Sequence, residues 1–192
     1  MRFRISLWTL GVVGASVCCA SQPLQAGPVA KGRNITPKGT TSFTSQTHAF
    51  SVWLPTQPTQ SSEAWYTGVG DSEPTSFGFE AIVKPIIYRI TVTPHRSGKA
   101  PSNPNKELNL IQQKFLDNPS DAFLKKESIQ LTGFWGRDIK TNWMGGQRVT
   151  RVRLYLTPKN LYEIVVSGPK AQMQKQDKQI DRVFDSFRIL PQ

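Results

Sequence analysis

The 192-residue sequence has only two cysteines, and they are adjacent, at Cys18 and Cys19 near the N-terminus. The rest of the chain therefore has no disulfide, no thiolate nucleophile and no cysteine-based metal site. Histidine is equally scarce. His48 and His95 both lie in polar segments, and no residues near them have the spacing of a metal site. We expect no bound metal ion and no cofactor.

Catalytic signatures are also missing from the sequence. Nothing matches a GxSxG elbow, an HExxH motif, a Walker-type phosphate loop or an EF-hand loop. The Gly68-Val69-Gly70 segment lacks the third glycine and the preceding strand of a dinucleotide site. Asp71 and Glu73 would need partners from elsewhere in the fold to bind a hard cation. These absences favour a protein that is not an enzyme.

The first 26 residues have the composition of a secretory signal. Arg2 and Arg4 form a positive segment, and a mostly apolar run follows from Ile5 to Ala20. A helix that spans a bilayer needs about 20 apolar residues. We expect cleavage after Ala26, with Ala20 as the alternative. A retained membrane anchor and lipidation of a cysteine are two further alternatives.

The remaining sequence divides by composition into a leader and one domain. Residues 27–47 are rich in Gly, Pro, Thr, Ser and Lys, which predicts a flexible leader, and residues 48–192 have the length of a single domain. The formal net charge of the chain is +11. A basic protein outside the cytosol meets anionic lipid, polysaccharide or acidic protein surfaces more often than nucleic acid, and we expect no nucleic-acid partner. A solvated basic surface without a dedicated partner is the alternative.

Hydrophobic periodicity predicts an α+β fold, a mostly antiparallel sheet with helices packed on it. Asn103 or Asn105 is expected to cap the first helix. The predicted elements are strands at 49–54, 63–69, 77–83 and 88–93, a helix after the loop at 95–106, a strand in the second half of 123–131, a tight turn at 133–138, a strand at 138–143, a helix after Pro169 that extends to Phe187, and a final apolar piece at 187–190.

Residues 147–169 predict a long β-hairpin around Thr157-Pro158-Lys159-Asn160. A two-residue loop would place Leu154 opposite Glu163 and would leave both faces mixed. We therefore expect a three-residue loop, which collects the apolar residues on one face. Its expected pairs are Leu156 with Tyr162, Leu154 with Ile164, and Val152 with Val166.

A basic stripe on the other face of this hairpin is the main candidate site. Its residues are Arg148, Arg151, Arg153 and Tyr155. Arginine side chains suit carboxylates and phosphates, which predicts an anionic partner. Two alternatives remain: Glu163 neutralises part of the stripe, or a helix covers this face.

Two further groups have a structural and a functional interpretation. Trp135 and Trp143 flank a predicted strand and are either core anchors or the lining of an aromatic pocket. Asp177, Asp181 and Asp185 fall on one helix face. We expect that face to be solvated and balanced by neighbouring Lys175, Lys178 and Arg182.

The sequence resembles the PsbP family of extrinsic photosystem II proteins, a wider group of secreted bacterial domains, and a yeast Ran-binding import factor. The matching segments cover roughly residues 48–190. They are Phe50-Ser51-Val52-Trp53-Leu54-Pro55, the turn from Gly133 to Asp138, the two hairpin strands, and the closing Phe184-Asp185-Ser186-Phe187-Arg188-Ile189.

The resemblance implies a PsbP-like α/β/α sandwich without enzymatic activity, which docks on a membrane-associated protein complex. In photosynthetic relatives the complex is photosystem II and the compartment is the thylakoid lumen. The His and acidic residues proposed for metal handling in those relatives have no counterpart here, so no metal role is carried over. The alternative function is an envelope module that binds a small anionic or apolar ligand in a pocket beside the sheet, lined by Trp135 or Trp143.

Overall fold

The computed structural model describes residues 42–61, 76–95, 101–116 and 122–191, which fall within one compact unit, Gly32–Gln192. The predicted signal at 1–26 and the predicted strand at 63–69 lie outside these residues. No helix in the described ranges is long and apolar enough to cross a bilayer.

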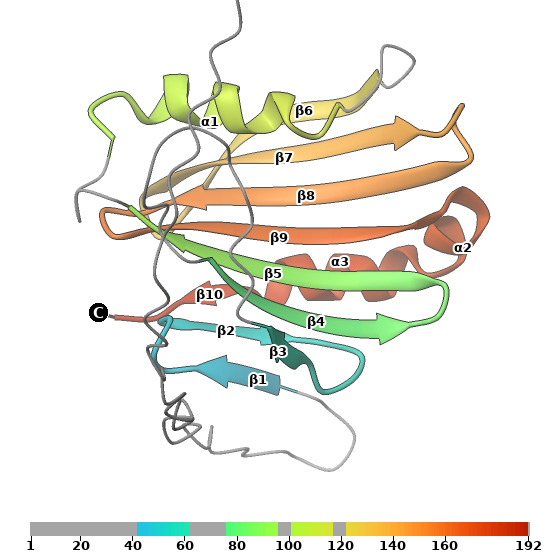
Figure 1. Ribbon diagram of the computed structural model, residues 1–192, viewed down its shortest axis with the longest axis horizontal. Helices are drawn as coiled ribbons and strands as arrows, with labels where there is room; N and C mark the ends of the chain where they lie inside the picture. The colour runs from blue at the N-terminus through green and yellow to red at the C-terminus, as the bar shows by residue number, and fades with distance from the viewer. Residues whose placement is uncertain (1–41, 62–75, 96–100, 117–121, 192) are drawn as a thin grey trace, which may run out of the picture. The chain divides into compact units, whose positions relative to one another are not determined.

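Seven antiparallel strands form the main sheet, in the order β3-β4-β5-β9-β8-β7-β6 (Figure 1). Every neighbouring pair in this sheet is antiparallel. The predicted α+β class is confirmed. The strands are β3 (Thr59–Ser61), β4 (Phe77–Val83), β5 (Ile86–Pro94), β6 (Ala122–Leu131), β7 (Phe134–Trp143), β8 (Arg148–Leu156) and β9 (Asn160–Pro169).

A second, three-stranded sheet has the order β1-β2-β10, with β1 (Ser42–Ser45), β2 (Phe50–Trp53) and β10 (Arg188–Ile189). β1 lies inside the segment assigned to a flexible leader, so the folded domain begins earlier than residue 48. Phe43 explains why this polar segment is ordered. Its ring lies 5.8 Å from that of Phe50 and 5.2 Å from that of Phe79. These apolar contacts attach β1 to the core.

Three helices complete the described fold. In α1 (Pro104–Gln113), proline occupies the first turn and the Asn103 side chain accepts a 3.0 Å hydrogen bond from the Lys106 backbone, the expected cap. The single helix predicted after Pro169 is instead two, α2 (Lys170–Lys175) and α3 (Asp177–Ser186), separated at Gln176. The buried Tyr88 hydroxyl donates to the Gln176 side chain at 3.1 Å, which fixes the position of this break.

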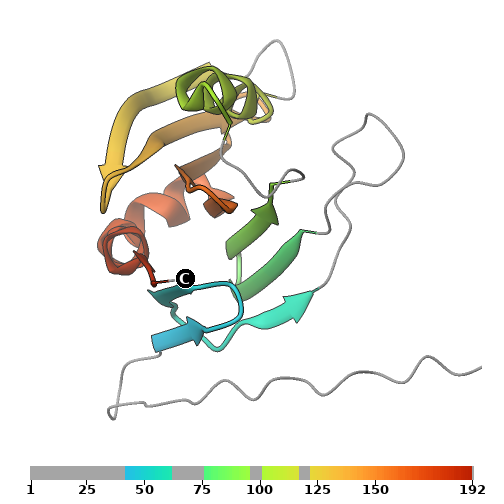
Figure 2. The same ribbon diagram turned by 90° about the vertical axis from the view of Figure 1, so that its left-hand side faces the viewer.

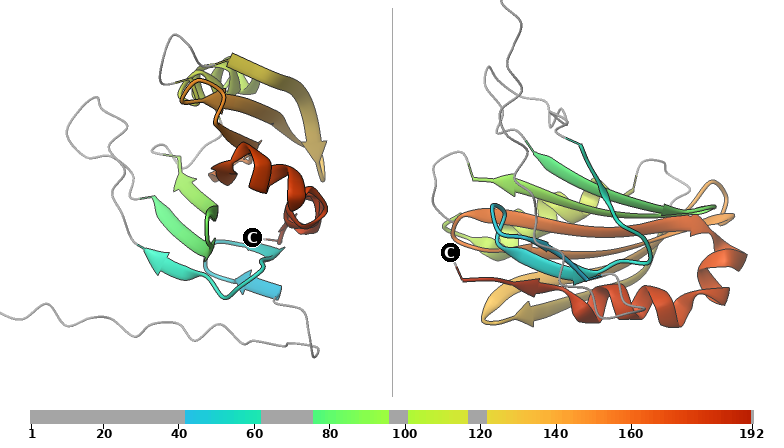
Figure 3. Two further views of the ribbon diagram at one scale, coloured as in Figure 1. Left: turned by 90° about the vertical axis from the view of Figure 1, so that its right-hand side faces the viewer. Right: turned by 90° about the horizontal axis from the view of Figure 1, so that it is seen from below.

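The main sheet is curved and has a different cover on each face (Figures 2 and 3). α2, α3 and the three-stranded sheet lie against one face, where the larger core cluster forms around residues such as Phe50, Tyr88 and Phe184. α1 lies against the other face, over a smaller cluster that includes Leu108, Ile139 and Val152. Because both faces are covered, both need apolar residues.

The predicted hairpin register is wrong. β8 and β9 pair Leu154 with Glu163 and Leu156 with Leu161, and the Thr157 backbone donates to Asn160 at 2.9 Å across the turn. This is the register of the two-residue loop. The prediction assumed one core face, whereas each strand here gives apolar residues to opposite faces of a sheet that is covered on both sides.

The turn predicted at 133–138 is also too long. The reversal occurs at Thr132 and Gly133, both with positive φ (51° and 83°), and β7 already begins at Phe134. Two residues with positive φ are typical of a tight type I′ hairpin turn. All of Ala122–Leu131 is strand, including the first half that the sequence left unassigned.

Candidate binding site

Two arginines of the predicted basic stripe lie under α3 and are paired with its aspartates. Arg151 Nη1 lies 2.8 Å from Asp181 Oδ1 and 3.2 Å from Asp177 Oδ1. Arg153 Nη1 lies 3.1 Å from Asp185 Oδ1. The three aspartates therefore pair with the sheet arginines, and the expectation that Lys175, Lys178 and Arg182 balance them is wrong.

Packing as well as charge holds these arginines. Both guanidinium groups stack on the Phe184 ring, 5.1 Å (Arg151) and 5.2 Å (Arg153) from its centroid. Arg153 Nε also lies 3.4 Å from the buried carboxylate of Asp138. With side chains only 15% and 21% exposed, Arg151 and Arg153 are part of the attachment of α3 and do not form an open basic surface.

The other two residues of the stripe are separated from each other. Tyr155 is buried, and its ring stacks on Phe187 at 5.7 Å with an interplanar angle of 2°. Burial raises the pKa of its phenol, while the charge of Arg153 opposes that shift. Arg148 has the opposite strand parity and faces the α1 side of the sheet. The predicted stripe is thus divided between two faces.

The pairing of the aspartates leaves the exposed side of α2 and α3 basic. No ion pair joins its cations to another residue of the described ranges. These cations are Lys170 and Lys175 of α2, Lys178 and Arg182 of α3, and Arg188 of the adjoining β10. The Arg182 guanidinium lies 4.2 Å from the ring centroid of Trp53 on β2, so one aromatic ring borders this basic face.

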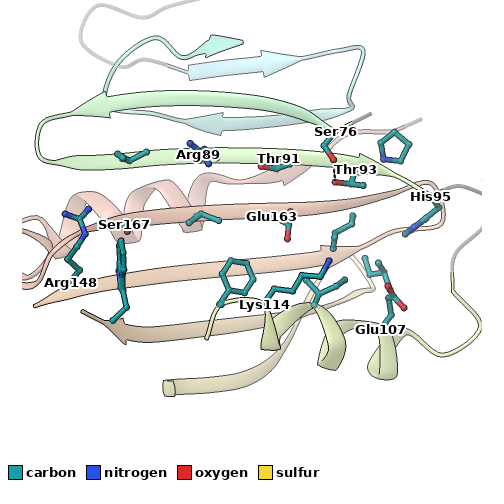
Figure 4. Close-up of a pocket in the computed structure, with 18 residues that line it drawn as sticks. Ser76, Arg89, Thr91, Thr93, His95, Glu107, Lys114, Arg148, Glu163 and Ser167 are labelled. Atoms are coloured by element: carbon teal, nitrogen blue, oxygen red, sulfur yellow. Dashed lines mark hydrogen bonds between the residues drawn. The ribbon is translucent and has the colours of Figure 1, made fainter. Parts of the chain in front are cut away.

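A groove of about 730 Å³ lies on the other side of the sheet, between α1 and strands β5, β9 and β8 (Figure 4). Its floor follows β9 from Leu161 to Ser167, which is roughly 20 Å at about 3.3 Å per residue. Ile111 of α1, Phe115 just after the end of α1, and Val165 of β9 provide apolar walls. The groove is elongated and mostly apolar, with polar groups at its ends and centre.

One end of the groove is basic and aromatic. Arg148 and Trp143 are cross-strand partners on β8 and β7, and the guanidinium lies 5.0 Å from the indole centroid. Arg148 Nε and Trp143 Nε1 are both buried without a hydrogen-bond acceptor in the described structure. The Ser167 hydroxyl accepts a 3.1 Å hydrogen bond from Thr150, which leaves its own proton free to donate. Three donors therefore lie at this end of the groove, and two of them, Arg148 Nε and Trp143 Nε1, have no acceptor in the described ranges.

The centre of the groove contains a carboxyl group, that of Glu163. Burial raises the pKa of this group, and the ammonium of Lys114 opposes the shift. Lys114 extends from α1 toward Glu163 across the groove (Figure 4). The other central cation, Arg89, donates from Nε to Glu80 Oε2 at 3.0 Å. The charges at the centre thus have partners of opposite sign.

The far end of the groove is polar and contains the acidic side chain of Glu107 from α1. The His95 ring lies 2.9 Å from the Thr157 carbonyl oxygen, and the hydroxyls of Ser76 and Thr93 are 2.8 Å apart. In the described ranges, no group of three or more His, Cys, Asp or Glu side chains has the arrangement of a metal site. The groove therefore has a basic end and an acidic end.

The structure separates the two predicted pocket tryptophans. Trp143 lines the groove, whereas Trp135 is 43% exposed at the start of β7 and is not among the lining residues. Binding by either residue stays a prediction. Lys114 was not among the predicted site residues, and Glu163 was predicted only as a neutralising partner of the basic stripe. Each is a charged residue within an otherwise apolar pattern in the sequence. This was the only sequence feature that could have identified them as site residues.

The fold is the PsbP-like α+β fold. The solution structure of the cyanobacterial PsbP protein (CyanoP) from Synechocystis sp. PCC 6803 aligns with 85% of this chain and 99% of that chain, with a TM-score of 0.57 and 10% identity. At this identity the likeness shows a shared fold and leaves the function open.

Two other solved structures align less closely. A protein of unknown function from Pseudomonas aeruginosa, PA94, has a TM-score of 0.49 and 11% identity over 80% of this chain and 99% of that chain. The Ran-binding protein Mog1p of Saccharomyces cerevisiae has a TM-score of 0.44 and 10% identity over 79% and 95%. No family model matches the chain, and no curated protein matches it.

Proposed function

We propose that this chain is a non-enzymatic binding domain that takes a small amphipathic ligand in the groove between α1 and the sheet. The groove itself is the observation that carries the proposal. Its volume of about 730 Å³ lies in the range of small-molecule sites, which are mostly apolar with a few convergent polar groups. Ile111, Phe115 and Val165 provide such walls, and Arg148 and Glu163 provide such groups.

The distribution of titratable groups favours binding over catalysis. His95 and Glu107 are at one end of the groove, Glu163 is at its centre, and Arg148 is at the other end. General acid–base chemistry needs its acid and base within hydrogen-bond reach of one reacting group. Groups spread along an elongated groove are better suited to orienting a ligand.

A fluorescent apolar probe tests the proposal. Nile red, a neutral dye, should bind the wild-type chain saturably with a stoichiometry of one. Val165→Phe places a larger side chain on the groove floor and should weaken dye binding about tenfold or more, because the space is no longer free.

Ser128→Phe is the matched control, since it adds the same side chain at an exposed position of β6. Dye binding in this variant should equal that of the wild type. If Val165→Phe and the wild type bind the dye equally, the groove is not the binding site and the proposal fails.

A second candidate function is docking on a membrane-associated protein complex, favoured by the basic exposed face of α2 and α3. Arg151 and Arg153 of β8 are paired with aspartates, so the exposed positive charge on this side of the sheet lies on Lys175, Lys178 and Arg182 instead. Exposed charges of one sign steer association with a surface of the opposite sign and are screened by salt.

Charge reversal distinguishes this surface from the predicted stripe. Membranes that retain the wild-type chain at low salt should release it at high salt, and the triple change Lys175→Glu, Lys178→Glu and Arg182→Glu should abolish retention. Reversal of three exposed lysines elsewhere, Lys84, Lys126 and Lys159, is the control. Equal loss in both variants would mean that net charge, and not this face, causes the association.

The proposal places the domain outside the cytosol, in a periplasm or thylakoid lumen, because residues 1–26 have the composition of a secretory signal. N-terminal sequencing of the chain recovered from cells tests this point. A mature terminus at Gly27 would support export, and an intact Met1 in the soluble fraction would contradict it.

A further inference from the structure

We infer that the ligand of the groove is an anionic amphiphile whose acidic head group binds at the Arg148–Trp143 end, with its apolar part along β9 toward Leu161. This inference rests on the proposed function and adds the charge of the ligand and its orientation.

The first support is the unmet hydrogen bonding at this end. A buried N–H without an acceptor is destabilising, so native structures rarely leave one. Here Arg148 Nε and Trp143 Nε1 are both buried without an acceptor, and their residues are cross-strand partners. Two neighbouring orphan donors indicate a place for a ligand with two acceptor oxygens.

The second support is the unbalanced charge of Arg148. Arg151 and Arg153 on the same strand have aspartate partners within 3.4 Å, whereas no ion pair joins Arg148 to any residue in the described ranges. Arginine pairs with carboxylates through two parallel hydrogen bonds, which is the strongest kind available to it. The guanidinium group lies over the Trp143 ring, 5.0 Å from its centroid, and Arg148 lines the groove, so its charge is directed to a ligand placed there.

The third support is the distribution of charged and polar groups along the groove. The Ser167 hydroxyl, which accepts from Thr150, adds a third donor at the basic end. At the far end, Glu107 would repel an acidic group. At the centre, Lys114 faces Glu163 and offsets its charge. The Arg148–Trp143 end is therefore the position where a negative charge is best stabilised, and the walls beyond it suit a tail.

Three ligands of equal length and different heads test the inference. Decanoate, decan-1-ol and decylamine are titrated separately into the full chain by calorimetry, below their aggregation concentrations. Decanoate should bind most tightly and decylamine most weakly. Arg148→Met, which retains the apolar stem, should weaken decanoate about 10-fold or more and change decan-1-ol by less than about 3-fold.

Two further variants separate charge from shape. Arg148→Lys retains the charge without the two-pronged geometry and should give an intermediate affinity for decanoate. Trp143→Phe retains the ring and removes the N–H, and should weaken decanoate about 3- to 10-fold. Arg182→Met is the control for net charge, because it removes one cation from the exposed face of α3, and it should bind as the wild type does.

The outcomes also distinguish the inference from the proposed function. If decan-1-ol binds and Val165→Phe abolishes it while Arg148→Met leaves decanoate unchanged, the groove binds ligands but the anionic head group is wrong. Tightest binding of decylamine would also overturn the inference, since Glu163 would then set the preference. If neither the neutral nor the acidic ligand binds, both proposals fail.

Discussion

At Gly136 the chain has no space for a side chain. A Cβ built there would collide with the backbone oxygen of Leu154 and would lie 2.8 Å from Cδ1 of the buried Tyr155 ring. The sequence predicted a turn over residues 133–138, which would include this glycine. It lies instead inside β7, where its role is to let β8 approach closely.

Gly136→Ala should therefore destabilise the fold by about 1–3 kcal/mol, because one added methyl group forces a backbone shift in a packed sheet. Urea unfolding of the variant and the wild type measures the change. Ser128→Ala on exposed β6 is the control and should stay within about 0.5 kcal/mol. A Gly136→Ala variant as stable as the wild type would show that the two strands separate easily at this point.

Glu163 makes the stability of the domain depend on pH. Burial raises the pKa of this carboxyl in the folded state above its value in the unfolded chain. The folded state therefore bears no penalty at low pH, where the group is protonated in both states. It is destabilised as the pH rises through the folded pKa, where the buried group must ionise.

Glu163→Gln removes this penalty without changing the shape of the side chain. The variant should be more stable than the wild type at about pH 8, and the gain should shrink toward about pH 4. Urea unfolding at the two pH values measures the difference. A gain of the same size at both would mean that Lys114 holds the carboxylate ionised in the folded state as readily as water does in the unfolded one.

At the scale of elements, α3 is attached to the sheet by charge as well as by its apolar face. Its buried face contains Ile180, Val183 and Phe184, and the aspartates beside that face pair with arginines of β8. The sequence predicted a covering helix as one alternative for the arginine face, and α3 is that helix. The pairing of its aspartates with the arginines was not predicted, because the sequence does not show which helix covers which face.

A double-mutant cycle measures this attachment. Arg151→Met and Asp181→Asn should each destabilise the fold, and the coupling between them should be up to about 1 kcal/mol, since Asp181 is half exposed. The same cycle with Lys178→Met in place of Asp181→Asn should give no coupling. A coupling of zero for the first pair would mean that Phe184 stacking alone fixes Arg151.

The hairpin shows the same limit of sequence reasoning. Its two strands and the position of its turn were predicted correctly, but the loop is one residue shorter than predicted, so the register was wrong by one residue. The alternation in β8 and β9 has apolar residues on opposite faces, which looks inconsistent for a sheet with one core. It is consistent for a sheet covered by α1 on one side and α3 on the other.

At the scale of the whole molecule, the groove is a product of the fold. Trp143, Arg148, Glu163 and Lys114 come from β7, β8, β9 and the end of α1, and no short motif brings them together. A pocket beside the sheet was predicted as an alternative, with Trp143 as one wall. The pairing of Lys114 with Glu163 at its centre could not be predicted without the register of β8 and β9.

The extent of the folded domain is a further property of the whole molecule. The three-stranded sheet joins β1 from the start of the described chain to β10 at its end through β2. Phe43 on β1 packs on Phe50 and Phe79, so loss of β1 would expose both rings to water.

A chain that begins at Thr47 should therefore be less stable than one that begins at Thr41, by at least about 2 kcal/mol, because it loses the aromatic contacts of Phe43 and the pairing of β1 with β2. Urea unfolding of the two chains measures the difference. Phe43→Ala in the longer chain should reproduce a large part of the loss, since it removes the ring and retains the strand. Equal stability of the two truncated chains would restore a domain boundary near residue 48 and would leave β1 as a dispensable edge strand.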